Sequence, residues 1–174
     1  IERVSLIDET GNPRSVASLA HRSDLALAYA GDPVPMYENL DVMPRAFAVH
    51  LSEVLKDEET LFRMQDSSFR SDRVVLLAEG APQAENRPTE GGVIQDDVEI
   101  TEYKSERAVV RTVSKQSGYL VLADTWYPGW TATVDGEAAH IYRADYIFRA
   151  VKLNSGEHQV VFEYRPASFR WGAV

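Results

Sequence analysis

The chain contains no cysteine. This absence excludes disulfide bonds, zinc sites with thiolate ligands, iron–sulfur clusters and cysteine nucleophiles. No run of about 18 apolar residues is present, and no basic segment followed by an apolar one opens the chain, so the sequence shows neither a membrane-spanning helix nor a signal peptide. Because the first residue is Ile1 and not Met, we expect the chain to be a segment of a longer protein.

A cluster of basic residues is also missing. The 174 residues include 18 Lys and Arg against 27 Asp and Glu, which gives a net charge of −9. Affinity for nucleic-acid phosphates depends on clustered Lys and Arg, so this balance argues against a nucleic-acid partner. With 44% hydrophobic and 26% charged residues, the composition is that of a globular protein with a core.

The common catalytic and metal-binding motifs are absent. The four histidines have neither HExxH nor HxH spacing, no GxSxG surrounds a serine, and Gly91-Gly92 lacks the Lys of a phosphate loop. The members of the pairs Glu58-Glu59 and Asp96-Asp97 would point to opposite faces of a strand, so we interpret both pairs as solvated surface. We therefore predict no catalytic residue, no metal site and no cofactor in this chain.

The last third of the chain has the pattern of an antiparallel β structure. It holds all three Trp, and short runs of alternating side chains are separated by the turn signals Tyr127-Pro128-Gly129-Trp130, Asp135-Gly136 and Asn154-Ser155-Gly156. We expect strands over residues 98–103, 108–113, 119–125, 130–134, 138–143, 146–153 and 158–164. Strands at this spacing predict a mainly β fold, an antiparallel β-sandwich of jelly-roll type.

The first part of the chain is mixed. We expect strands over residues 4–7, 25–29, 34–37, 46–51 and 74–77, and one helix over residues 57–64, with Leu61, Phe62 and Met64 on its apolar side. Residues 79–92 contain Pro82 and Pro88 with little apolar content, which is typical of a linker. We predict a smaller α+β N-terminal lobe at 1–92 and a C-terminal sandwich at 93–174, or one continuous domain with a shared core.

Three groups of short motifs occur in a fixed order along the chain. They are Met36-Tyr37-Glu38-Asn39 with Met43-Pro44-Arg45-Ala46-Phe47, then Tyr127-Pro128-Gly129-Trp130 with Val134-Asp135-Gly136, and then Tyr142-Arg143-Ala144-Asp145 with Gly156-Glu157-His158 and Tyr164-Arg165-Pro166. With these motifs, residues 34–78 and 98–172 resemble the extracytoplasmic portion of the bacterial YfhO family.

The resemblance implies more than the residues alone indicate. YfhO proteins are polytopic membrane proteins regarded as GT-C-type glycosyltransferases that use lipid-linked sugars. The resemblance implies that the domain lies on the extracytoplasmic face of the cell membrane. It also implies that the transmembrane portion of the parent chain is its partner. It also implies that Phe169-Arg170-Trp171-Gly172 leads into a membrane helix. The acidic residues expected to hold metal and to catalyse transfer belong to a membrane loop outside this chain, so no catalytic residue is carried over.

The candidate ligand-binding residues are aromatic or basic. Trp126, Tyr127 and Trp130 offer flat rings that can stack on sugars, but the alternative is that Trp130 points into the core and Tyr127 covers the end of the sheet.

Two further motifs supply basic candidates. Arg45 could bind an anionic headgroup or pair with an internal carboxylate. Tyr142 and Arg143 are expected beside Asp145 at a hairpin, where they either contact a ligand or only form the turn.

These observations lead to a non-catalytic extracytoplasmic domain with an accessory role. The domain is expected either to cover the active-site mouth of the membrane enzyme or to bind a glycan or a cell-envelope polymer as acceptor. Two alternatives stay open. The domain could be a free secreted carbohydrate-binding module, which its aromatic residues favour, or a protein-interaction or spacer domain, which the acidic N-terminal part favours.

Overall fold

The computed structural model describes residues 6–7, 13–14, 25–29, 36–40, 42–78 and 96–166. The chain divides into two compact units, residues 1–43 and residues 44–174. The linker predicted at residues 79–92 and the segment Phe169–Gly172 lie outside the described residues.

The first unit contains two short antiparallel pairs. Strand β1 (Leu6–Ile7) pairs with β2 (Pro13–Arg14), and β3 (Leu25–Tyr29) pairs with β4 (Met36–Asn39). The strand predicted at residues 25–29 is confirmed, and the one predicted at 34–37 begins two residues later.

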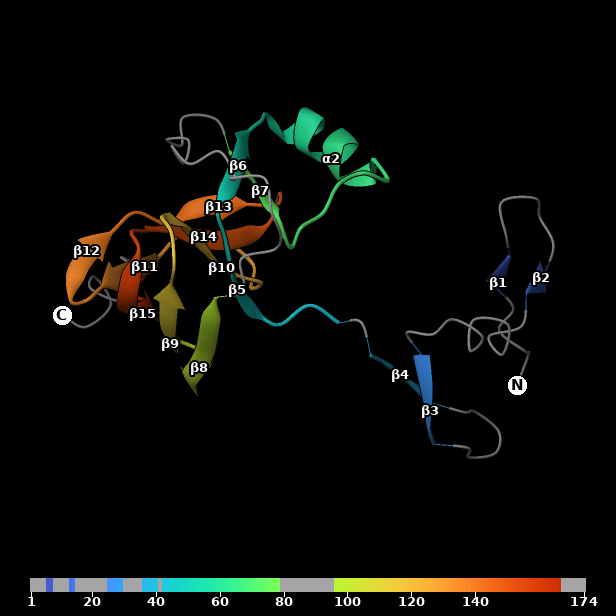
Figure 1. The fold of residues 1–174 in the computed structure, drawn as a ribbon, viewed down its shortest axis with the longest axis horizontal. Coiled ribbons are helices and arrows are strands. Elements are labelled where there is room, and N and C mark those ends of the chain that lie inside the picture. Colours follow the sequence, from blue (N-terminus) through green and yellow to red (C-terminus); the bar gives the residue numbers. More distant parts are fainter. Residues whose placement is uncertain are drawn as a thin grey trace. The chain divides into compact units, whose positions relative to one another are not determined.

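The second unit contains two sheets (Figure 1). The six-stranded sheet has the order β5 (Ala46–Val49), β10 (Gly118–Leu122), β14 (Phe148–Leu153), β13 (Tyr142–Ala144), β7 (Val74–Leu77) and β6 (Leu51–Val54). The five-stranded sheet has the order β12 (Glu137–Ala139), β11 (Trp130–Val134), β15 (Gly156–Tyr164), β9 (Arg107–Ser114) and β8 (Asp97–Tyr103). All neighbours in both sheets are antiparallel except β6 and β7, so the predicted mainly β, antiparallel sandwich is confirmed.

The main core lies between the two sheets. Its buried side chains come from the six-stranded sheet (Ala46, Leu120, Leu122, Val151 and Leu153) and from the five-stranded sheet (Ala108, Val110, Ala132, Val160 and Phe162). Because side chains alternate along a strand, Tyr119 and Val121 of β10 point the other way and join a second buried cluster. Strand β10 is therefore buried on both faces.

The second cluster exists because the six-stranded sheet curls back on itself. Its edge strands β5 and β6 are separated in the chain by His50 alone, so the two edges meet end to end at this residue. Side chains of β5, β7, β10, β13 and β14 then meet inside the curl. At the bend, a Cβ on Gly118 would lie 2.3 Å from the carbonyl oxygen of Val49, so only glycine fits there.

Two predicted strands are each divided in the structure, which corrects the prediction. Residues 46–51 form β5 and the start of β6, because the chain bends at His50 to pair with two different strands. Residues 138–143 cover β12 and the start of β13, and the chain passes from the five-stranded to the six-stranded sheet between them. An alternating pattern predicts which face of a strand is buried, but it does not report a change of partner.

Helix α2 (Asp57–Gln65) connects the parallel strands β6 and β7 (Figure 1). The acidic residues Asp57, Glu58 and Glu59 occupy its first turn, where they complement the helix dipole. Only Thr60 is buried. The predicted apolar side, formed by Leu61, Phe62 and Met64, is exposed, because side chains of the strands themselves already fill both clusters.

Candidate functional site

A buried arginine joins the two sheets at one end of the sandwich. Arg149 lies on the face of β14 that also carries Val151 and Leu153, and it is only 2% exposed. Its guanidinium carbon lies 3.8 Å from the ring centre of Trp130 and 5.7 Å from that of Phe162, both on the five-stranded sheet. A cation over aromatic faces in a place without water is a stabilising contact.

Asp124 collects the polar groups around this arginine. Arg149 Nη2 donates to Asp124 Oδ2 at 2.9 Å, Arg45 Nη1 donates to Asp124 Oδ1 at 2.7 Å, and the hydroxyl of Tyr103 donates to the same Oδ1 at 2.9 Å. The Arg45 guanidinium carbon also lies 4.9 Å from the ring centre of Tyr103. We call Arg45, Tyr103, Asp124 and Arg149 the Asp124 cluster; the structure thus gives Arg45 an internal carboxylate as partner.

The Asp124 cluster carries one net positive charge, since its two arginines share a single carboxylate. Burial lowers the pKa of Arg149, and the charge of Asp124 acts in the opposite direction. The hydrogen bond to Asp124 raises the pKa of Arg45. Within the described part of the chain, Nε and Nη1 of Arg149 have no hydrogen-bond acceptor, so the ring of Trp130 supplies the contact to this buried charge.

Residues 123–129, which we call the aromatic loop, cross from β10 to β11 beside this cluster. The amide of Ala123 donates to Arg45 O at 2.7 Å, and the amide of Arg165 donates to Gly129 O at 2.7 Å. The turn that ends the loop has Gly129 at φ +104° and a Cβ there would lie 2.9 Å from the Tyr164 ring, which agrees with the predicted type II turn. The backbone of the loop is therefore fixed at both ends.

Trp126 and Tyr127 are exposed on the aromatic loop, at 37% and 59% respectively. Trp130, by contrast, is partly buried and packs against the main core. Tyr142 is also partly buried and meets the ring of Tyr119 edge-on at 5.6 Å. Of the aromatic candidates, only Trp126 and Tyr127 thus present their rings to solvent.

Arg143 belongs to a neighbouring turn. It forms an ion pair with Asp57 of helix α2, and its Nη1 donates to Tyr146 O at 3.1 Å. The turn that follows β13 contains Asp145, Tyr146 and Ile147, and Ile147 O accepts a hydrogen bond from the amide of Trp126. Arg143 is thus linked to the aromatic loop through this turn.

Asp145 anchors the turn to β7. Its Oδ1 accepts a hydrogen bond from the amide of Leu76 at 2.9 Å, and its own amide donates to Leu76 O at 2.7 Å. The residue is 3% exposed, has φ +44°, and its Oδ2 has no partner among the described residues. Burial raises the pKa of this carboxyl to about 6.

The prediction that Asp96 and Asp97 are both solvated is wrong for Asp96. Asp97 is exposed, but the side chain of Asp96 is 1% exposed, with Oδ2 2.9 Å from His50 Nε2 and 2.9 Å from Ser114 Oγ. The amide of Lys115 donates to its Oδ1 at 3.1 Å. Because His50 and Ser114 both contact the carboxylate, the histidine is not placed to activate the serine, and the group holds three segments together.

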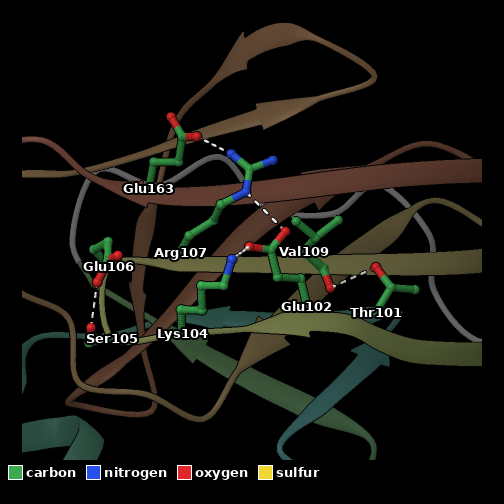
Figure 2. Close-up of polar contacts among 8 residues, drawn as sticks. All are labelled: Thr101, Glu102, Lys104, Ser105, Glu106, Arg107, Val109 and Glu163. Atoms are coloured by element: carbon green, nitrogen blue, oxygen red, sulfur yellow. Dashed lines mark hydrogen bonds and ion pairs between the residues drawn. The ribbon is translucent and has the colours of Figure 1, made fainter.

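Ion pairs cover the β8–β9 hairpin near the Asp124 cluster (Figure 2). Arg107 contacts Glu102 on β8 and Glu163 on β15, and Lys104 lies 2.8 Å from Glu102. These charges are largely neutralised by one another, which leaves the single excess charge of the Asp124 cluster as the local imbalance.

Neither a metal site nor a membrane span is found in the part of the chain that the structure describes. No group of three His, Asp or Glu side chains there could hold a metal ion. No helix among the described residues is long and apolar enough to cross a membrane.

Local sequence patterns did not indicate most of the polar residues that organise this region. Arg149 gave a usable signal, because it alternates with Val151 and Leu153 along a predicted strand and so shares their buried face. Asp124 lies two residues after the buried strand β10. The role of Tyr103 had no local signal, since its partner lies 21 residues away.

Comparison with known proteins supports a family assignment for this region. Residues 92–174 match the family model described as bacterial membrane protein YfhO. This range contains the sandwich strands from β8 to β15 and the aromatic loop. No curated protein and no solved structure matches the chain. The resemblance is confirmed for the C-terminal part, and for residues 34–78 it stays a prediction.

Proposed function

Since residues 92–174 match the family model of the bacterial membrane protein YfhO, we propose that this chain is a non-catalytic accessory domain of a membrane protein, on the extracytoplasmic face of the cell membrane. Its partner is the transmembrane portion of the parent chain, which transfers sugar from a lipid-linked donor. The domain binds the acceptor, a glycan or a cell-envelope polymer.

The exposed rings of Trp126 and Tyr127 on a fixed loop carry this proposal. Flat rings that stay in place lose little entropy when a sugar stacks on them, and they combine an apolar face with a polar edge. Arg45, whose side chain is 53% exposed, is bonded to Asp124 of the same loop and to the hydroxyl of Tyr103, and it can donate further hydrogen bonds to sugar oxygens.

The buried polar groups favour a binding role over a catalytic one. Asp124 is neutralised by two arginines, Asp96 is held by three partners, and Asp145 is 3% exposed. General acid–base transfer needs carboxyl groups within reach of a substrate, and these three are occupied or enclosed.

The test is a titration of the chain with soluble saccharides and with cell-envelope polymer fractions, followed by Trp fluorescence and amide spectra. We expect Trp126→Ala to weaken binding at least about tenfold, because one stacked ring contributes a large share of such a site. Lys152→Ala is the matched control, because Lys152 is an exposed residue of β14 near the end of the strand opposite to Arg149. Unchanged spectra with every saccharide would remove the glycan-binding role, and unimpaired transfer by a parent protein that lacks the domain would remove the accessory role.

A further inference from the structure

The residues where the chain enters and leaves the sandwich are bonded to the same loop. The chain enters β5 through Arg45, whose carbonyl accepts from Ala123, and it leaves β15 through Arg165, whose amide donates to Gly129. Both contacts lie on the aromatic loop. Arg45 and Arg165 therefore lie at the same end of the sandwich, where the aromatic loop crosses between the sheets.

The same end carries an exposed apolar surface. Tyr146 and Ile147 are 37% and 44% exposed on the turn that bonds to Trp126, and Tyr127 lies on the adjacent loop. We call Tyr127, Tyr146 and Ile147 together with Trp126 the end patch. Exposed apolar residues that gather on neighbouring turns can mark a contact surface.

The chemistry of this patch matches the boundary between lipid headgroups and acyl chains. Trp and Tyr are enriched at that boundary because their rings combine an apolar body with a polar group, and Arg supplies contacts to headgroups. Arg45 and Arg165, paired with Asp124 and Glu163, flank the patch with side chains 53% and 72% exposed. The Asp124 cluster is thus a site of net charge +1 within a chain whose total charge is −9.

We propose that the end patch lies against the lipid bilayer, with Ile147 and Tyr146 at the level of the headgroups. Residues 92–174 match a family of membrane proteins, which makes a bilayer the expected neighbour of the domain. The positions of Arg45 and Arg165 indicate which end of the sandwich is turned toward it. This orientation places Trp126 and its neighbours next to the membrane surface, which is where a lipid-linked sugar becomes accessible to an acceptor. The inference adds to the proposed function but needs only the membrane assignment.

The absence of cysteine allows a direct test with single labels. Ile147→Cys carries an environment-sensitive fluorophore, and Val113→Cys is the matched control, since Val113 is 49% exposed at the opposite end of β9 from Arg107. Vesicles of phosphatidylethanolamine and phosphatidylglycerol are added to the folded 174-residue chain. We expect the emission of the label at residue 147 to shift to the blue while the label at residue 113 does not change. An equal response of both labels, or no response at residue 147, overturns the proposal.

Unlabelled variants give a second readout. Ile147→Ser should reduce co-sedimentation with these vesicles roughly fivefold, because it removes apolar area that enters the bilayer surface, whereas Val113→Thr should not. Saccharide binding separates the two proposals. Vesicle binding without saccharide binding contradicts only the glycan-binding role, and saccharide binding without vesicle binding contradicts only the membrane orientation.

Discussion

The guanidinium of Arg149 lies 3.8 Å from the ring centre of Trp130, across the interface of the two sheets. Arg149 also pairs with Asp124, which in turn holds Arg45 and Tyr103. The end of the sandwich is thus closed by a buried cation and not by an apolar side chain. This arrangement fixes the start of the aromatic loop while leaving Trp126 and Tyr127 exposed.

Replacing the buried arginine should destabilise the domain. In Arg149→Met the apolar volume is largely kept, but the contact with Trp130 is weakened and Asp124 retains only one cationic partner. We expect a loss of about 2–3 kcal/mol in the free energy of unfolding, measured by urea denaturation. Lys152→Met, an exposed position on the same strand, should change it by less than about 0.5 kcal/mol. Equal stability of the two variants would show that the cation is dispensable.

The buried carboxyl of Asp145 should make the domain more stable in acid. Its pKa is raised from 3.8 to about 6 in the folded state, so the folded state binds more protons than the unfolded state between these values. Stability therefore falls as pH rises through this window, by about 3 kcal/mol in total for this group. Asp145→Asn keeps the acceptor for Leu76 and tolerates the positive φ, so we expect unfolding measurements to show a flatter pH profile and higher stability at pH 7.

Asp135 provides the matched control for this experiment. It also has a positive φ, but its side chain is half exposed, and the hydrogen bond from His158 lowers its pKa. Its stabilising contribution is present above its unfolded pKa and is lost as pH falls, which is the opposite sign. If Asp145→Asn leaves the pH slope of the wild type unchanged, the carboxyl is ionised in the folded state over this window.

The adjacent carboxylates Asp96 and Asp97 should differ sharply in their effect on stability. Asp96→Ala removes the acceptor of the Lys115 amide and one of the two acceptors of Ser114 Oγ, and it leaves the buried His50 without its carboxylate neighbour. We therefore expect a loss of about 2–3 kcal/mol in the free energy of unfolding. Asp97→Ala removes an exposed side chain of β8 and should be nearly neutral. Thermal unfolding of both variants decides this, and equal melting temperatures would contradict the buried group.

Local patterns predicted the strands and turns well. Trp130–Val134 and the turn at Asp135-Gly136, with φ of +54° and +87°, lie where alternation and turn residues indicated them. The curl at His50 was not predictable, because it depends on which strands pair with β5 and β6. Tertiary partners decide such features.

The candidate site was predicted in part for the same reason. The turn motif predicted accessible rings at Trp126 and Tyr127, and both rings are exposed. An internal carboxylate was one of the two partners expected for Arg45. The identity of that carboxylate, Asp124, required the fold, since 79 residues separate it from Arg45. The prediction for Asp96 was wrong because the sequence does not distinguish two adjacent aspartates, of which the structure buries the side chain of one.

The way both chain connections meet on the aromatic loop has a mechanical consequence. A pull applied through Arg45 and Arg165 would act first on the two single hydrogen bonds at Ala123 and Gly129, and then on β5 and β15 from the same end. Strands peeled from one end lose their bonds one after another and resist with little force. The domain should therefore have low resistance to tension along the chain. Such tension would unfold it from the aromatic loop inward.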